Sequence, residues 1–305
     1  MPAVASLRRL RSLLAAAAVA VLVAGCGGGG SARAPATGGA GAAGTQPSAT
    51  PSGAGAGPGA AGPRPPTPGP ATADPAVIAV RARVPVLTYH QVRDRTAADG
   101  ASARPLIVPP ARFAAQMDAL ARAGYHTVSG EELVDHLATG AALPPRPVLV
   151  TFDDGSEGQW ANAVPVLRRH GFRATFFVMT VVLDKPRWLS RAQVRALDRT
   201  GMTIASHTWD HHDVARYAGD DWRVQLDGSA RELAGLVGHP VRLFAYPYGS
   251  WSRAAFPHLR QAGYVAAFQL AQPLDRTAPL YTIRRIMVDP SWDGPALLRQ
   301  MRADF

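Results

Sequence analysis

One stretch decides how this chain folds: Arg146-Pro-Val-Leu-Val-Thr-Phe-Asp153-Asp154-Gly155. Its apolar centre, residues 148–152, is β-branched and aromatic and lies between a proline and a glycine, which predicts a buried strand. Successive side chains of a strand point to opposite faces, so Asp153 and Asp154 can serve one site only if the chain turns there, and Gly155 permits such a turn. Two close carboxylates can divide metal binding and proton transfer between them. A solvated Asp-Asp-Gly turn is the alternative that this stretch leaves open.

Strand and helix patterns alternate along the chain around this stretch. Apolar runs predict further strands at 84–90, 174–179, 202–206, 241–246, 264–269 and 281–288. Helical periodicity predicts helices at 110–123, 131–138, 159–170, 191–199, 222–237 and 254–262, the third of them kinked by Pro165. This alternation predicts an α/β domain with a parallel sheet, most simply a barrel, whose functional residues follow the C-terminal strand ends.

Composition divides the 305 residues into three parts. Residues 1–26 have the parts of an export signal: a basic start, an apolar stretch from Leu13 to Val23 and small residues at the end. Residues 27–80 are rich in glycine, alanine and proline and are expected to form a disordered tether. Residues 81–305 are expected to form one large domain with ample core.

Cys26 is the only cysteine, which excludes a disulfide within the chain and a thiolate metal site. The ending Leu22-Val-Ala-Gly-Cys26 resembles a bacterial lipobox, in which cleavage exposes the cysteine for lipid attachment. An ordinary secretory signal with an incidental cysteine is the alternative, but the position of the sole cysteine favours the lipoprotein. We therefore expect a lipid anchor at Cys26 that holds the protein at the extracytoplasmic face of the bacterial cell membrane.

The net charge of +10 does not indicate a nucleic-acid partner. Three of the positive charges, Arg8, Arg9 and Arg11, lie in the expected leader, and the other basic residues are scattered. No block of like charge with interleaved aromatic residues occurs. Lys185 is the only lysine, and this preference for arginine is typical of GC-rich coding.

Two further segments follow predicted strands and carry polar or aromatic side chains. His207, His211 and His212 lie within six residues, whereas the other six histidines are not clustered. Residues four apart share one face of a helical turn, so His207 and His211 can chelate one divalent ion. The segment Phe244-Ala-Tyr-Pro-Tyr-Gly249 either walls a groove, where a ring can stack on a sugar, or is a packed surface turn.

Three runs together resemble the ordered motifs of the polysaccharide deacetylase family (NodB homology, carbohydrate esterase family 4): Thr151-Phe-Asp-Asp-Gly155, His207-Thr-Trp-Asp-His211 and Tyr246-Pro-Tyr-Gly249. The resemblance covers about residues 84–290 and implies an irregular (β/α)7-type barrel. It also implies a catalytic base, Asp153, and three metal ligands: Asp154, His207 and His211. His212 is the alternative to His211, since some relatives space the pair by five.

The third motif and the missing late motif place the chain closer to one branch of the family. The resemblance implies that the backbone N–H of Tyr248 helps to hold the oxyanion and that Tyr246 belongs to the substrate groove. Ala245 stands where the motif usually carries arginine, and the usual late motif with a histidine is absent. Both features resemble the branch that deacetylates poly-N-acetylglucosamine, in which the motif order is circularly permuted and the acid histidine comes early.

The permuted order implies that His90, after the strand predicted at 84–90, is the general acid. Arg284 or Arg285, in the strand predicted at 281–288, is expected to replace the missing arginine as the partner of Asp153.

The resemblance implies a metal-dependent hydrolase that removes N-acetyl groups from an N-acetylglucosamine polymer or peptidoglycan and releases acetate. Zinc is the expected ion, and nitrogen and oxygen ligands also accept cobalt or nickel. The alternatives are an O-acetyl esterase acting on acetylated xylan-like glycans and a glycan-binding module without turnover. The presence of both carboxylates and of His207 and His211 argues against the binding module.

Overall fold

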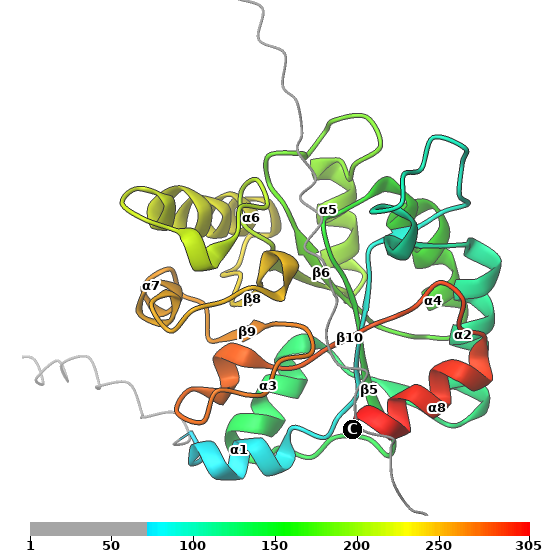
Figure 1. The fold of residues 1–305 in the computed structure, drawn as a ribbon, viewed down its shortest axis with the longest axis horizontal. Coiled ribbons are helices and arrows are strands. Elements are labelled where there is room, and N and C mark those ends of the chain that lie inside the picture. The colour runs from blue at the N-terminus through cyan, green and yellow to red at the C-terminus, as the bar shows by residue number, and fades with distance from the viewer. Residues whose placement is uncertain (1–71) are drawn as a thin grey trace, which may run out of the picture. The chain divides into compact units, whose positions relative to one another are not determined.

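A curled sheet of parallel strands forms the centre of the structure, a computed structural model that describes residues 72–305 (Figure 1). The strands follow the order β10-β1-β5-β6-β7-β8-β9, and β4 pairs with β5 outside this path. Their bounds are β1 Val86–Tyr89, β4 His126–Thr127, β5 Pro147–Phe152, β6 Thr175–Val178, β7 Thr203–Ser206, β8 Leu243–Ala245, β9 Ala266–Phe268 and β10 Ile286–Met287. Two short strands, β2 Gln91–Val92 and β3 Ile107–Val108, form a separate pair.

The segment that leads into β10 joins the two edges of the sheet. Ile283 forms a parallel bridge with Phe268 of β9, and Ile286 pairs with Leu87 of β1. The sheet is therefore curled far enough for the four residues 283–286 to contact both of its edges. Arg285 lies between these two contacts and is 3% exposed.

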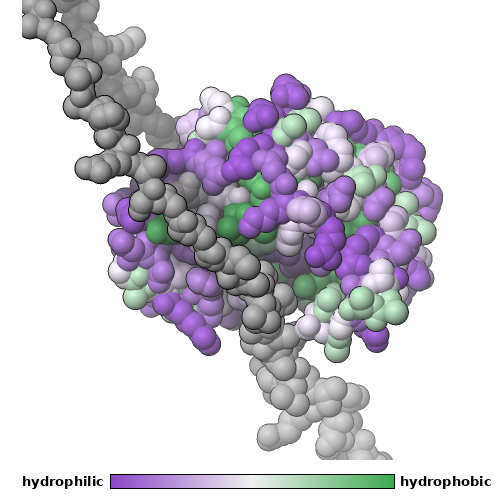
Figure 2. Space-filling view, turned by 90° about the horizontal axis from the view of Figure 1, so that it is seen from above, coloured by the Kyte–Doolittle hydropathy of each residue, from purple (hydrophilic) through white to green (hydrophobic). Residues whose placement is uncertain are grey.

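Helices cover the outside of the sheet (Figure 1). Between helices and sheet lies a large apolar core, in which Tyr89, Phe113, Phe152 and Phe176 pack ring against ring with centroids 4.8–5.8 Å apart. On the face seen in Figure 2, hydrophilic residues dominate and apolar residues form only small patches. The bounds of these helices are α2 Pro110–Arg122, α4 Val164–Arg169, α5 Arg191–Arg199, α6 Ser229–Val237, α7 Ala255–Gln261 and α8 Gly294–Asp304.

A second core fills the inside of the curl and is closed at one end by two helices, α1 Pro75–Arg81 and α3 Gly130–Thr139. The strands contribute inward side chains such as Leu149 and Phe177, and the helices contribute Ile78, Leu133 and Leu137. α3 touches the first residues of the strands, because its Gly130 N–H donates to Thr175 at the start of β6. The N-terminal ends of the strands are therefore plugged, and the C-terminal ends are left for a site.

The structure corrects several expected boundaries. α1 overlaps the last residues of the segment predicted as a tether and buries Ile78, so the domain begins before residue 81. The helices predicted at 159–170 and 222–237 each begin with a π-helical turn, Gln159–Ala163 and Trp222–Gly228. Pro165 lies in the first turn of α4, directly after the π-helical turn at Gln159–Ala163.

The last predicted strand is shorter than expected, and some elements had no counterpart in the prediction. Of residues 281–288 only β10 is a strand, and it follows a 3₁₀ turn at Pro279–Thr282. The pair β2 and β3 and the terminal helix α8 were not predicted. The expected leader, Cys26 and most of the expected tether lie outside the described residues. Within residues 72–305, no helix combines the length and the apolar character needed to span a bilayer.

Candidate active site

Polar side chains from distant parts of the sequence meet at the C-terminal ends of the strands. His90 follows β1, Asp153 and Asp154 follow β5, and His207 follows β7. β1 and β5 are parallel, with Tyr89 opposite Phe152, so His90 and Asp153 leave the sheet as neighbours. The sheet therefore brings together the side chains that the sequence placed after separate strands.

The chain turns at Asp154, as the glycine after it predicts. Asp154 and Gly155 both adopt left-handed backbone angles, with φ of 73° and 83°. This turn places both carboxylates at the same strand end, although an extended chain would point them to opposite faces. Seven non-glycine residues of the described chain have positive φ, and four of them lie at this site: Asp154, Thr208, His211 and Tyr248. Backbone strain is therefore concentrated around the candidate site.

Asp154, His207 and His211 form a cluster that fits a divalent metal ion. One ligand atom from each lies within 4.8 Å of the others, and Asp154 Oδ1 is 3.4 Å from both Nε2 atoms. This Oδ1 is buried and has no hydrogen-bond partner among the described residues. An oxygen in that state gains a partner when a cation binds, so the donor set fits the expected ion.

The protonation states of these three side chains also suit a metal. Burial lowers the pKa of His207 to about 3 and that of His211 to about 4, so both imidazoles are neutral at pH 7. His207 Nδ1 lies 2.8 Å from the carbonyl oxygen of Ala245, which assigns its proton to Nδ1 and leaves the Nε2 lone pair toward Asp154. Burial raises the pKa of Asp154 to about 6, and the nearby Asp153 adds to this.

His211, and not His212, belongs to the cluster. The His212 side chain is 69% exposed and lies beside Asp210, with His212 Nδ1 3.5 Å from Asp210 Oδ1. The predicted helical turn between His207 and His211 is wrong. Residues 207–213 form an irregular loop instead, held by a hydrogen bond from the His211 N–H to Thr208 Oγ1.

Arg285 is the arginine that pairs with Asp153. Its two terminal nitrogens donate to the two carboxylate oxygens at 2.6 and 2.8 Å, and both side chains are buried. Burial alone would raise the pKa of Asp153, but the charge of Arg285, together with His207 and His90, lowers it to about 2. Arg284, the other candidate, lies over the ring of Phe305 and does not take part.

His90 lies close enough to Asp153 to share a substrate with it. His90 Nε2 is 3.9 Å from Asp153 Oδ2, and the His90 side chain is 13% exposed. An imidazole and a carboxylate in this position can exchange protons with one reacting group.

The two tyrosines of the third segment have different surroundings. Tyr248 is 47% exposed, and its ring packs edge-on against His211 with centroids 4.5 Å apart. Its backbone N–H has no acceptor among residues 72–305. Tyr246 is fully buried and donates its hydroxyl to the Tyr281 carbonyl at 2.9 Å. The placement of Tyr246 in the substrate groove was therefore wrong, because its ring belongs to the core.

Gln159 is a residue of the site that the sequence did not indicate. It is fully buried, and its amide nitrogen donates to the backbone carbonyls of His90, at 2.7 Å, and Asp153, at 2.6 Å. One side chain thus ties together the two strand ends that carry the candidate acid and base. A single glutamine in a predicted helix gives no signal of such a role.

Comparisons with known proteins find similarity to polysaccharide deacetylases. The family model described as polysaccharide deacetylase matches residues 140–267. The protein YxkH of Bacillus subtilis (strain 168) is 26% identical over 217 residues, which cover 70% of this chain and 75% of that protein. The poly-beta-1,6-N-acetyl-D-glucosamine N-deacetylase of Escherichia coli (strain K12) is 24% identical over 66% of this chain, which spans only 36% of that enzyme.

Solved structures share the fold. IcaB from Ammonifex degensii superposes with a TM-score of 0.61 at 26% identity, covering 72% of this chain and 97% of that chain. The Streptococcus pyogenes deacetylase PplD, solved in complex with acetate, superposes with a TM-score of 0.66 at 23% identity, over 72% of this chain and 97% of that chain. The curled parallel sheet is therefore the architecture of known deacetylase structures.

Proposed function

We propose that this chain, in which the family model described as polysaccharide deacetylase matches residues 140–267, removes N-acetyl groups from an N-acetylglucosamine polymer, with a divalent metal ion as cofactor. The observation that supports this most directly is the cluster of Asp154, His207 and His211 beside the ionised Asp153. The Escherichia coli relative is a poly-beta-1,6-N-acetyl-D-glucosamine N-deacetylase, which favours a glucosamine polymer over other acetylated glycans. Peptidoglycan, which also carries N-acetyl groups, is the second candidate substrate.

Asp154, His207 and His211 would hold the metal ion. Two imidazoles and one carboxylate suit zinc, and cobalt and nickel accept the same ligands. A bound divalent ion supplies Lewis-acid chemistry, since it lowers the pKa of water and polarises a carbonyl oxygen.

The protein's own residues divide the remaining work. Asp153 accepts a proton from the water whose oxygen attacks the acetyl carbon. Arg285 keeps this carboxylate ionised and fixes its orientation through two hydrogen bonds. The Tyr248 N–H donates to the carbonyl oxygen as negative charge develops on it. His90, in its protonated form, gives a proton to the sugar nitrogen as the carbon–nitrogen bond breaks, so the products are acetate and a free amine.

The location of the enzyme is proposed from the sequence alone. A leader that ends at Cys26 would export the chain, and lipid attachment there would hold it at the extracytoplasmic face of the membrane. A tether of about 50 residues would reach on the order of 40 Å from the membrane, into the region that contains envelope polysaccharides.

Acetate release from three substrates tests the proposal: poly-N-acetylglucosamine, peptidoglycan and acetylated xylan, each with and without a chelator. We expect release from an N-acetylated polymer, loss of release with chelator and recovery with added zinc or cobalt. Release from acetylated xylan alone would identify an O-acetyl esterase. No release from any substrate by the metal-loaded protein would indicate a binding module and contradict the proposal.

A further inference from the structure

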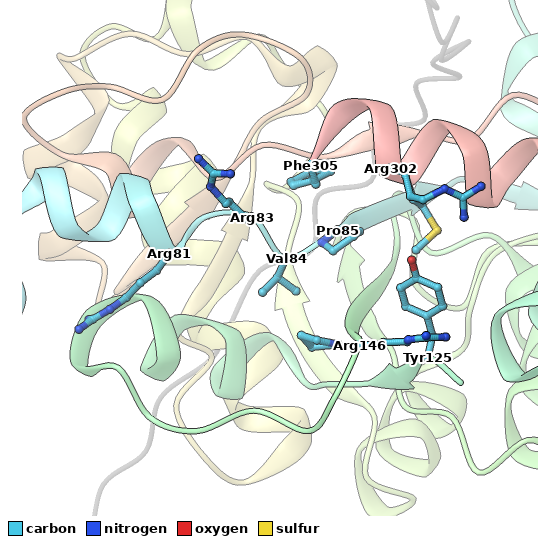
Figure 3. Close-up of a pocket in the computed structure, with 10 residues that line it drawn as sticks. Arg81, Arg83, Val84, Pro85, Tyr125, Arg146, Arg302 and Phe305 are labelled. Carbon is cyan, nitrogen blue, oxygen red and sulfur yellow. The ribbon is translucent and has the colours of Figure 1, made fainter. Parts of the chain in front are cut away.

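A depression rimmed by arginines lies at the end of the barrel opposite the catalytic site (Figure 3). Its volume is about 310 Å³, and it lies where β1 and β5 begin, because Pro85 and Pro147 line it. His90 and Asp153 follow the other ends of the same two strands, so the length of β5, ~20 Å at ~3.3 Å per residue, separates the two places. Four arginines line the depression: Arg81, Arg83, Arg146 and Arg302.

These four guanidinium groups have no acidic partner within residues 72–305. None of them forms an ion pair with a described residue, and neither aspartate nor glutamate lines the depression. Arg81 and Arg146 donate to the backbone carbonyls of Leu137 and Ala123. Arg83 and Arg302 are exposed. No side-chain carboxylate of the described residues therefore pairs with the positive charges at this place.

The arrangement does not suit one small anion. Arg81 and Arg302 lie on opposite sides of the depression and point away from each other (Figure 3). The floor between them is apolar and includes Val84, Pro85 and Phe305. A basic rim around an apolar floor matches a surface that carries many negative groups above an apolar layer.

The neighbouring helix α1 adds exposed apolar side chains. Val77 is 41% exposed and Val80 is 68% exposed, and Val80 is the most exposed of the five large apolar side chains at the surface of the described residues. Two of the other three, Trp209 and Tyr248, lie in the loops of the catalytic site. α1 is nevertheless attached to the domain, because Ile78 is buried in the inner core. The two valines are therefore exposed on a helix that packs on the domain and that also carries Arg81.

We propose that this basic face, made of the four arginines with Val77 and Val80, docks on an anionic phospholipid bilayer. The arginines would contact lipid phosphates, and the valines would enter the interfacial layer. Docking by this end turns the catalytic end of the barrel away from the bilayer, toward the polysaccharide. α1 is the first helix of the described residues, and the expected tether precedes it in the sequence. The inference does not depend on the proposed deacetylation, because no catalytic residue takes part.

A fluorescent label placed on α1 tests the docking. Cys26 is the only cysteine, so the full chain with Cys26→Ala and Val80→Cys carries an environment-sensitive fluorophore at one position. The control is Val224→Cys, at an exposed position of the Trp222–Gly228 turn. We expect the label at 80 to report an apolar environment with vesicles that contain phosphatidylglycerol, and not with phosphatidylcholine alone. The label at 224 should not respond, and added salt should weaken the response.

Charge substitutions show whether the arginines cause the binding. The variant with Arg83→Gln and Arg302→Gln removes two exposed cations and should keep its fold. Each change is expected to weaken binding to anionic vesicles about fivefold, which corresponds to ~1 kcal/mol. The matched control neutralises two exposed arginines of α5 and α6, Arg195→Gln and Arg231→Gln.

Three results would overturn the docking: equal weakening by both arginine pairs, an equal response to neutral vesicles, or a response to soluble poly(glycerol phosphate) in place of vesicles. The last would assign the face to a wall polymer. Acetate release from a soluble oligosaccharide should be the same in both arginine variants and in the parent chain. Loss of docking and loss of catalysis are thereby measured separately.

Discussion

The two ends of the barrel differ in whether their buried polar groups have hydrogen-bond partners. At the C-terminal end, Asp154 Oδ1 is buried without a partner, and four non-glycine residues adopt positive φ. At the N-terminal end, α3 begins with a capping box between Ser129 and Glu132, and Glu131 accepts a hydrogen bond from Thr203. The same strands connect both ends. The well-packed helices α1 and α3 at one end can therefore support an arrangement at the other end that is unfavourable until a ligand binds.

Removing the carboxylate of Asp154 should lower activity and raise stability, and these are the largest effects that we expect. Asp154→Asn keeps the size of the side chain and tolerates the positive φ. We expect acetate release to fall at least ~10³-fold, because the metal loses its carboxylate ligand. The metal-free protein should become more stable by about 1–3 kcal/mol near pH 7, since the raised pKa shows that the charged carboxylate is disfavoured in the fold.

The sign of this effect gives a pH test. The folded pKa of Asp154, about 6, exceeds its value of 3.8 in the unfolded chain, so ionisation destabilises the fold as pH rises above the unfolded value. The gain from Asp154→Asn should therefore disappear near pH 3. Urea unfolding of both proteins with chelator measures it. A less stable variant at pH 7 would show that the carboxylate has a stabilising partner.

A cavity in the inner core beside α3 should lower stability and leave activity unchanged. Leu133 is 1% exposed and packs in the inner core, so Leu133→Ala should lower the free energy of unfolding by ~2–5 kcal/mol. Acetate release per folded molecule should stay the same, because Leu133 lies on α3, at the end of the strands away from the site. The control Asp135→Ala, exposed on the same helix, should stay within about 0.5 kcal/mol of the parent. A large loss of turnover in Leu133→Ala would mean that packing at the N-terminal end of the barrel affects the catalytic site.

A substitution of Gln159 tests whether catalysis requires the hydrogen bonds that join the ends of β1 and β5. Gln159→Met keeps the length of the side chain but removes the donor to the His90 and Asp153 carbonyls. We expect kcat to fall about tenfold, with KM and bound metal unchanged and the pH profile of kcat altered. The same exchange at Gln300, on α8, is the control. An unchanged pH profile together with lowered stability would leave Gln159 a purely structural role.

The smallest effect is expected at the N-cap of α3. Ser129→Ala removes the acceptor of the Glu132 N–H and should cost ~1 kcal/mol of stability. Metal affinity and turnover should not change, because the cap lies at the plugged end. Parallel unfolding and metal titrations measure both quantities. Weaker metal binding in this variant would show that the N-terminal end of the barrel affects the metal site.

The sequence predicted the side chains of the site better than their partners. The turn at Asp154 could be predicted because Gly155 follows two carboxylates, and the cluster of histidines follows a strand. Tyr246 could not be assigned, because the alternation of a short strand does not tell which side faces the core until the next strand is in place. Similarly, α1 directly follows the low-complexity segment, and only Ile78 in the inner core shows that it belongs to the domain.

By itself, the sequence determined the parallel α/β architecture, the strand that ends in Asp153 and Asp154, and the residue types of the candidate metal site. These depend on patterns within a few residues, which local sterics and hydrophobic period fix. Only the tertiary structure decided that Arg285 pairs with Asp153 across 132 residues, that Gln159 ties two strand ends, and that four arginines gather at the plugged end. The physical reason is that these contacts exist only once the sheet has curled and brought distant segments together.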